Sequence, residues 1–314
     1  MYIGIDIGGT KCAVLLGDNV NGKPIIKEKI RFDTLSVKET LNKIFESVER
    51  LIKLESCSAI GISCGGPLDE ERGVILSPPN LPGWDNVHIT EMLEEKFGIP
   101  ARLCNDANAC ALAEWKFGAG RGTRNMVFFT FGTGLGAGLI IDGKLYSGTN
   151  GMAGEAGHIR LARSGPVGYG KAGSFEGFCS GGGIAKYARL KATEALERGK
   201  PFAFAKNAEE INALTARLVA EQARLGDRDA LSIYKATGRR LGQGLATVID
   251  ILNPEAIVIG SIYQRCEDLL RPEMLKALRL EALGESLSVC RILPAALGES
   301  IGDIAALAVA IEKR

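Results

Sequence analysis

The sequence of 314 residues lacks the marks of secreted, membrane and nucleic-acid-binding proteins. Its eight cysteines are scattered and form no CxxC pair, which indicates reduced core residues in a cytosolic protein. No apolar run approaches the roughly 20 residues of a membrane span, and the start of the chain has no signal-peptide pattern. Lys plus Arg total 38 against 37 for Asp plus Glu, so no basic excess favours nucleic acid or anionic membrane. We expect a cytoplasmic protein with neither partner.

Length and patterning predict a mixed α/β protein of two domains. A chain of 314 residues with 46% hydrophobic residues is long enough to bury more than one core. Short apolar runs alternate with amphipathic stretches, as in α/β folds. Helices are expected at 41–52, 90–97, 105–117, 229–252 and 301–313, and strands at 58–64, 101–104 and 255–260.

Two segments of the chain repeat one pattern. They are IGIDIGGTKCAVLLGDNVNGK, from Ile3, and VFFTFGTGLGAGLIIDGKLY, from Val127, and each predicts a strand, a glycine-rich turn and a second strand. The glycine loop therefore joins the strands of a hairpin, whereas a P-loop leads from a strand into a helix. Two such hairpins predict two related lobes that face each other. We place an N-terminal lobe at 1–117, completed by a helix at 298–314, and a second lobe at 118–297.

The first glycine loop, DIGGTK, has the residues of a phosphate-binding turn. Gly8 and Gly9 let the backbone approach a phosphate, and the hydroxyl of Thr10 can donate to its oxygens. Lys11 adds positive charge, and Asp6 is placed to hold a magnesium ion through water. Taken alone, this loop is more typical of a hairpin turn without a ligand.

The second glycine loop, FGTGLGAG, favours the ligand interpretation. It carries Gly132, Thr133, Gly134 and Gly136. Glycine loops at equivalent places in two hairpins suit opposite sides of a triphosphate. We therefore expect a nucleotide that both loops contact.

Asp106 is the candidate catalytic base. It follows an apolar strand and opens a helix, where the helix dipole favours an ionised carboxylate. Phosphoryl transfer needs positioning, charge neutralisation and a carboxylate that accepts the proton of the attacking hydroxyl. Asp106 and its neighbour Asn105 are also common helix-capping residues, so a purely structural role is the alternative.

Glu155, His158 and Glu176 are the candidates for binding vicinal hydroxyls. They lie in the glycine-rich segments AGEAGHI and GSFEGF. A lone histidine on an apolar stretch is more often structural, but His158 has an acid three residues away in a glycine-rich loop, which favours a site. The other histidine, His88, is expected at the surface or at a helix cap.

Five ordered motifs span essentially the whole chain: DIGGTK, NDANACALAE, FGTGLGAG, GEAGH and LNPEAIVIG. Together they resemble the ROK family of sugar kinases and sugar-responsive repressors. The resemblance implies the actin-like ATPase (ribonuclease H-like) fold, with ATP and Mg²⁺ in a cleft between two lobes, a hexose beside them, and a homodimer. Asp106 would be the base. The implied sugar ligands are Gly66, Asn80, Asn105, Asp106, Glu155, His158 and Glu176.

The chain departs from the family pattern at two places. Where the family commonly has CxCGxxGCxE, whose cysteines bind zinc with the motif histidine, this chain has VGYGKAGSFE. Val167, Tyr169 and Ser174 stand at the cysteine positions, and since zinc needs soft or basic ligands we expect no zinc. The hydroxyls of Tyr169 and Ser174 are expected to orient His158 instead. The second departure is the pair Gly260 and Ser261, two glycines in the family, where the resemblance implies an adenosine contact.

Phosphorylation of a hexose is the predicted function, with glucose and its 6-hydroxyl as the first expectation. Fructose, allose, N-acetylmannosamine or a β-glucoside would use the same polar residues. A sugar-binding regulatory protein without catalysis, and an actin-like ATPase without a sugar, are the rival classes. The family's repressors carry an N-terminal helix-turn-helix, whereas this chain begins with a predicted strand at Tyr2, so we expect no DNA-binding domain.

Overall fold

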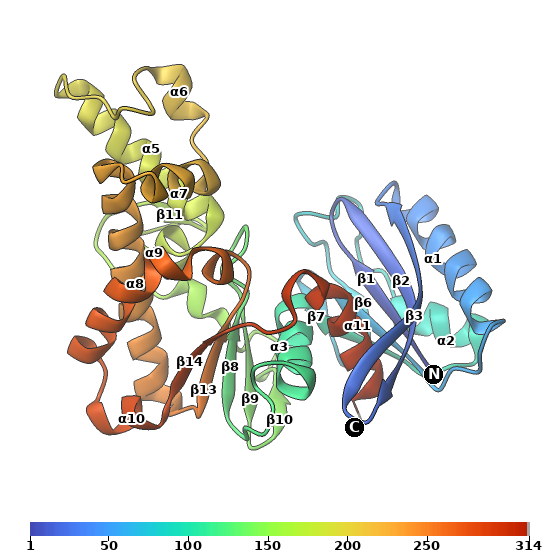
Figure 1. Cartoon of the computed structure of the whole chain (residues 1–314). Helices are drawn as coiled ribbons and strands as arrows, with labels where there is room; N and C mark the ends of the chain where they lie inside the picture. Colours follow the sequence, from blue (N-terminus) through green and yellow to red (C-terminus); the bar gives the residue numbers. More distant parts are fainter. Residues whose placement is uncertain (313–314) are drawn as a thin grey trace. The chain divides into compact units, whose positions relative to one another are not determined.

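The computed structural model describes residues 1–312 and divides into two compact units (Figure 1). Unit 1 comprises Met1–Phe128, Gly138–Ala153 and Ala296–Arg314, and unit 2 comprises Phe129–Ala137 and Gly154–Ala295. These contact-based units group residues 118–128 and 138–153 with the N-terminal part of the chain. The division into functional lobes stays a prediction.

The strands are β1 (Tyr2–Ile7), β2 (Lys11–Val20), β3 (Lys23–Asp33), β4 (Ala59–Cys64), β5 (Leu68–Asp69), β6 (Val74–Ile75), β7 (Ala101–Asn105), β8 (Met126–Phe129), β9 (Ala137–Ile141), β10 (Lys144–Tyr146), β11 (Val167–Gly168), β12 (Lys171–Ala172), β13 (Ala256–Ile259) and β14 (Arg291–Pro294). The α-helices are α1 (Val37–Ile52), α2 (Ile89–Phe97), α3 (Asp106–Phe117), α4 (Phe175–Phe178), α5 (Gly181–Glu197), α6 (Ala208–Asn212), α7 (Ala216–Arg224), α8 (Arg228–Leu252), α9 (Ile262–Glu281), α10 (Gly284–Val289) and α11 (Ile301–Ile311). Two 3₁₀ helices are η1 (Glu155–His158) and η2 (Gly298–Ser300). The predicted helices and strands are confirmed in type, with ends shifted by a few residues; Lys313, in the expected last helix, lies outside the described residues.

The first sheet has the strand order β3-β2-β1-β4-β7. β1 and β2 form an antiparallel hairpin, so the first glycine loop turns between two strands as predicted. β4 and β7 run parallel to β1, and their register aligns Ile7, Cys64 and Asn105. Because parallel strands end at one edge of a sheet, the segments that follow these three residues start from the same edge.

The two faces of this sheet are covered by different helices. Successive side chains of a strand point to opposite faces, and Ile3 and Ile5 belong to an apolar core that includes residues of α1 and α2. Gly4 and Gly61 face α11, since a Cβ on Gly61 would lie 2.3 Å from the carbonyl oxygen of Ala306. The last helix of the chain thus lies beside the first strand (Figure 1).

A second sheet has the order β10-β9-β8-β13-β14. β13 and β14 pair in parallel, and the long helices α8 and α9 lie side by side in unit 2 (Figure 1). The glycines of α8 explain how close they come: a Cβ on Gly238 would lie 2.5 Å from the carbonyl oxygen of Leu270, and one on Gly242 2.4 Å from that of Met274. Glycine at these two positions therefore allows the backbones of α8 and α9 to pack closely.

Within residues 1–312, no helix is both long enough and apolar enough to cross a membrane. All eight cysteines are free thiols.

Candidate functional site

The junction of β7 and α3 positions the predicted base. Asn105 is the N-cap of α3, and its Oδ1 accepts a hydrogen bond from the amide of Ala107 at 3.0 Å. Oδ1 of Asp106 accepts from the same amide at 2.8 Å. The other carboxylate oxygen points toward Gly65, where a Cβ would lie 3.9 Å from it. Burial raises the pKa of Asp106, and the amide hydrogen bond opposes that shift. Asp106 therefore has one tethered oxygen and one directed at a glycine loop.

Glycine loops and Asn80 gather beside this junction. A Cβ on Gly9 would lie 2.5 Å from the carbonyl oxygen of Asn80, and one on Gly65 would lie 3.5 Å from the Asn80 side-chain nitrogen. A Cβ on Gly66 would lie 3.4 Å from the side-chain nitrogen of Asn105. The predicted residues Gly9, Gly66, Asn80 and Asn105 are thus brought together, and glycine is required at Gly9 by backbone approach. Gly9 and its neighbours Thr10 and Lys11 are exposed.

Asp6 lies near the end of β1, at the same edge of the sheet, close to other carboxylates. Burial, and after it the carboxylates of Asp303 and Asp106, raise the pKa of Asp6 to about 6, while Lys29 and Arg31 lower it. Neighbouring carboxylates of this kind are a setting that a divalent cation relieves. Among residues 1–312 no group of three or more His, Cys, Asp or Glu could hold a metal directly. A cation here would keep most of its water ligands, which is the habit of Mg²⁺.

Glu70 was not predicted from the sequence, although it contacts the same junction. Its Oε1 accepts the backbone amide of Asn105 at 2.7 Å and the side-chain amide of Asn108 at 3.3 Å. Its Oε2 accepts the hydroxyl of Ser147 at 3.1 Å. In the sequence Glu70 is one of two adjacent glutamates after a short strand, and nothing distinguishes it from Glu71.

The second glycine loop lies in unit 2 and contacts a predicted sugar ligand. Thr130 closes the loop, since its Oγ1 accepts the amide of Gly136 at 3.0 Å. Glu176 Oε2 accepts the amide of Leu135 at 3.1 Å, and a Cβ on Gly134 would lie 2.9 Å from that oxygen. Gly134 and Gly136 therefore shape the loop and its contact with Glu176.

The segment around His158 differs from its expected arrangement. Tyr169 contacts the ring of His158 edge-on, with centroids 6.3 Å apart, rather than through its hydroxyl. The hydroxyl of Ser174 caps α4 instead, accepting the amide of Gly177 at 3.1 Å. The expectation that Ser174 orients His158 is wrong, because its hydroxyl accepts from Gly177 and donates to the carbonyl oxygen of Gly168 at 3.3 Å. Lys171 instead donates to the carbonyl oxygen of His158 at 2.9 Å.

Unit 2 also contains a cavity of about 710 Å³. Gly132 and Thr133 of the second glycine loop line it, together with the first residues of α5 and α9 and one face of α7. The amide of Gly181, at the start of α5, donates to the carbonyl oxygen of Gly132 at 2.8 Å, which fixes the loop at the cavity wall. The wall contains Ser261, while the amide of its neighbour Gly260 donates to Phe129. The cavity is large enough for a nucleotide-sized ligand.

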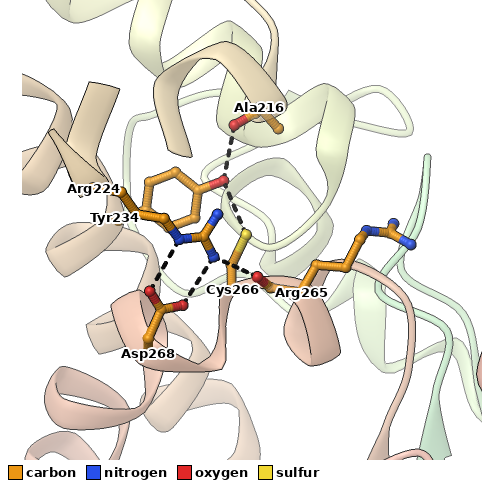
Figure 2. Close-up of polar contacts among 6 residues, drawn as sticks. All are labelled: Ala216, Arg224, Tyr234, Arg265, Cys266 and Asp268. Atoms are coloured by element: carbon orange, nitrogen blue, oxygen red, sulfur yellow. Dashed lines mark hydrogen bonds and ion pairs between the residues drawn. The ribbon is translucent and has the colours of Figure 1, made fainter. Parts of the chain in front are cut away.

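Arg224, whose side chain lines this cavity, is held by hydrogen bonds to α9 (Figure 2). Nε and Nη2 of Arg224 donate to the two carboxylate oxygens of Asp268, at 3.1 and 3.0 Å. Nη2 also donates to the carbonyl oxygen of Arg265 at 2.5 Å. This carbonyl precedes Cys266, whose φ of −130° interrupts α9. The first turn of α9 is therefore tied to α7 at a kink.

Proteins of known name or known structure are similar to this chain over nearly its whole length. The ROK family model matches residues 2–313, and the chain belongs to the ROK family. The glucokinase of Streptomyces coelicolor is 32% identical over 314 residues, which cover 99% of this chain and 98% of that protein. A ROK family glucokinase from Streptomyces griseus, solved in complex with glucose and AMPPNP, is 30% identical, with a TM-score of 0.76 and 98% of both chains covered. The chain thus has the actin-like ATPase fold.

Repressors also occur among the relatives. The xylose repressor of Caldicellulosiruptor bescii is 31% identical over 266 residues, which cover 82% of this chain and 65% of the repressor. Membership of the family alone therefore does not distinguish a kinase from a regulator, and the residues of the site must be considered.

Proposed function

We propose that the protein is a cytoplasmic ATP-dependent kinase that phosphorylates a hexose, most directly glucose at its 6-hydroxyl. The observation that carries the proposal is Asp106: a buried carboxylate with a raised pKa, one oxygen held by an amide and the other directed at a glycine loop. This combination suits a base, because the raised pKa strengthens the affinity of the Asp106 carboxylate for a proton. The eight free thiols fit a reducing compartment.

In the proposed reaction the sugar hydroxyl attacks the γ-phosphorus of ATP. The bond from that phosphorus to the bridging oxygen of ADP breaks, and the hydroxyl proton passes to Asp106. The residues proposed to hold the sugar are Gly66, Asn80, Asn105, Glu155, His158 and Glu176. Their amide, carboxylate and imidazole groups can donate to and accept from vicinal hydroxyls.

The cavity of unit 2 is the proposed nucleotide site. Gly132 and Thr133, which line the cavity, would contact the phosphates. Ser261 of the cavity wall and its neighbour Gly260 would lie beside the adenosine. The first glycine loop, Gly8–Thr10, and Lys11 would contact the phosphates as well. Mg²⁺, bound near Asp6 through water, would neutralise charge on the phosphates. The acidic setting of Asp6 fits this ion.

Release of ADP that depends on added sugar tests the proposal. Purified protein with ATP and Mg²⁺ would be offered glucose, fructose, allose, N-acetylmannosamine and a β-glucoside in turn, with a sugar-free control. We expect the largest kcat/KM with glucose. Preference for another sugar would change the proposed substrate and leave the proposed kinase activity in place. Tight sugar binding without ADP release would favour a regulatory protein, which the similarity to a xylose repressor makes the second candidate. Light scattering would test the proposed homodimer.

A further inference from the structure

The Glu70 carboxylate receives hydrogen bonds from two separate segments of unit 1. Glu70 follows β5, and its Oε1 accepts the amide of Asn105 at 2.7 Å and the Nδ2 group of Asn108 at 3.3 Å. Ser147 donates to Oε2 at 3.1 Å. The buried thiol of Cys104 also hydrogen-bonds to this carboxylate; burial first and then Glu70 raise the pKa of Cys104. Donors to an ionised carboxylate form the stronger class of hydrogen bond.

Oε1 fixes the backbone immediately before the proposed base. The amide of Asn105 belongs to the last residue of β7, and Asp106 is the first residue of α3. Asn108 lies one helical turn further along and is nearly fully buried. The single oxygen thus joins the end of the strand to the first turn of the helix. Rotation of this turn would move the Asp106 carboxylate relative to the glycine loop at Gly65.

Oε2 fixes a loop that leads to other proposed sugar ligands. Ser147 begins the segment 147–153, which closes on itself because the amide of Ala153 donates to the carbonyl oxygen of Ser147 at 3.0 Å. Gly148 and Gly151 have positive φ angles, of 76° and 78°, so the loop conformation is one that glycine permits. Ala153 is followed directly by Gly154 and Glu155. A displacement of Ser147 would therefore also displace Ala153, the residue before the GEAGH motif.

We propose that Glu70 is a positioning residue of the sugar side of the site. Its two carboxylate oxygens hold the Asp106 junction and the 147–153 loop in register, so that the base and the loop preceding Glu155 are set by one side chain. The proposal rests on the proposed kinase function. Glu70 need not touch the substrate, and its effect passes through Asn105 and Ser147.

Steady-state kinetics with separate variation of sugar and ATP test this role. Glu70→Ala is expected to lower kcat by about 10- to 100-fold and to raise the KM for sugar, with the KM for ATP changed by less than about threefold, because misplacement of a base is costly to the chemical step. Ser147→Ala loses only the Oε2 contact, so it should raise the KM for sugar by a few-fold and leave kcat within about threefold. Glu70→Gln should retain most activity, since its carbonyl oxygen can accept from Asn105 and its amide can donate to Ser147.

Coupling and control variants separate positioning from general destabilisation. If both changes act through one contact, Glu70→Ala/Ser147→Ala should be no slower than Glu70→Ala alone. Glu71→Ala, at the exposed neighbouring glutamate, should match the unmodified chain in both kinetics and thermal unfolding. If Glu70→Ala does not fold, the positioning role is tested by the KM for sugar of Ser147→Ala and by the activity of Glu70→Gln.

Three results would overturn the positioning role: additive effects in the double variant, equal increases in the KM values for ATP and sugar, or a Glu70→Ala enzyme as active as Glu71→Ala. Absence of sugar-dependent ADP release in the unmodified chain would instead refute the proposed function, before any variant is compared.

Discussion

Each of the two candidate binding regions holds a charged side chain in place by hydrogen bonds, and the charges have opposite signs. At the start of α3, carboxylates are oriented by N–H and O–H donors: Asp106 by an amide, and Glu70 by an amide and a hydroxyl. In the cavity of unit 2, a guanidinium is oriented by acceptors, since Arg224 donates to Asp268 and to a backbone carbonyl. The first arrangement orients the proposed base, and the second attaches the start of α9 to α7 at the wall of the proposed nucleotide cavity. The chemistry proposed for each region can therefore be tested independently.

The largest expected effect is that of Asp106→Asn. We expect kcat to fall by about a hundredfold or more while sugar affinity is largely kept, because an amide can hydrogen-bond but cannot take the proton at neutral pH. Steady-state kinetics and sugar titration measure the two quantities. Asp142→Asn, at an exposed position, is the control for the same chemical change. Unchanged turnover would remove Asp106 from the role of base.

Arg224→Ala should affect the other region. Loss of the guanidinium frees the first turn of α9 from α7, and we expect the KM for ATP to rise by about tenfold with the KM for sugar within about twofold. The KM for ATP of Arg224→Lys should lie between those of the unmodified chain and Arg224→Ala, since an ammonium cannot donate to the two oxygens of Asp268 in the way a guanidinium does. The control is Arg279→Ala, near the exposed end of the same helix. A larger change in the KM for sugar than in that for ATP would contradict the division of roles.

The smallest effect concerns pH and Asp6. Its pKa is raised from 3.8 to about 6 in the folded protein, so the folded state binds more protons between these values. The free energy of unfolding therefore falls as pH rises through this window and stays lower above it. Without Mg²⁺, Asp6→Asn should be more stable than the unmodified chain at pH 8, by ~2 kcal/mol, and should lose this advantage toward pH 4.

Thermal unfolding at the two pH values, with and without Mg²⁺, measures this effect. Added Mg²⁺ should stabilise the unmodified chain at pH 8 more than Asp6→Asn. If Asp6→Asn were less stable than the unmodified chain at pH 8, the result would contradict a pKa of Asp6 that burial, and after it Asp303 and Asp106, raise.

Local chemistry made much of the fold predictable. Gly98 ends α2 with φ of 67°, and Asn253 ends α8 with φ of 44°, both at the breaks expected from the sequence. Asn105 caps α3, which the residue type and the preceding strand indicated. These features depend on neighbours within a few positions, and the sequence displays such neighbours directly.

The unpredicted features depend on contacts between distant segments. Glu70 meets Ser147 across 77 positions, and no periodicity or motif records that pairing. Glu114 is fully buried and accepts the amides of Ala296 and Leu297, about 180 positions away, yet its motif suggested only a helix. Ser174 was assigned to His158 because it stands at a cysteine position of the family's zinc motif, whereas the start of α4 takes its hydroxyl. Burial and partner choice are tertiary effects, so they require the structure.

The most direct test of a sugar kinase is the identity of its product. Phosphorus-31 NMR of a reaction containing the protein, ATP, Mg²⁺ and glucose would follow the γ-phosphoryl group as ATP is consumed. We expect a phosphomonoester signal, split by the two protons on carbon 6, that grows in step with ADP and is absent when Asp106 is replaced by Asn. Growth of inorganic phosphate in place of that ester, at a rate independent of added sugar, would contradict the account.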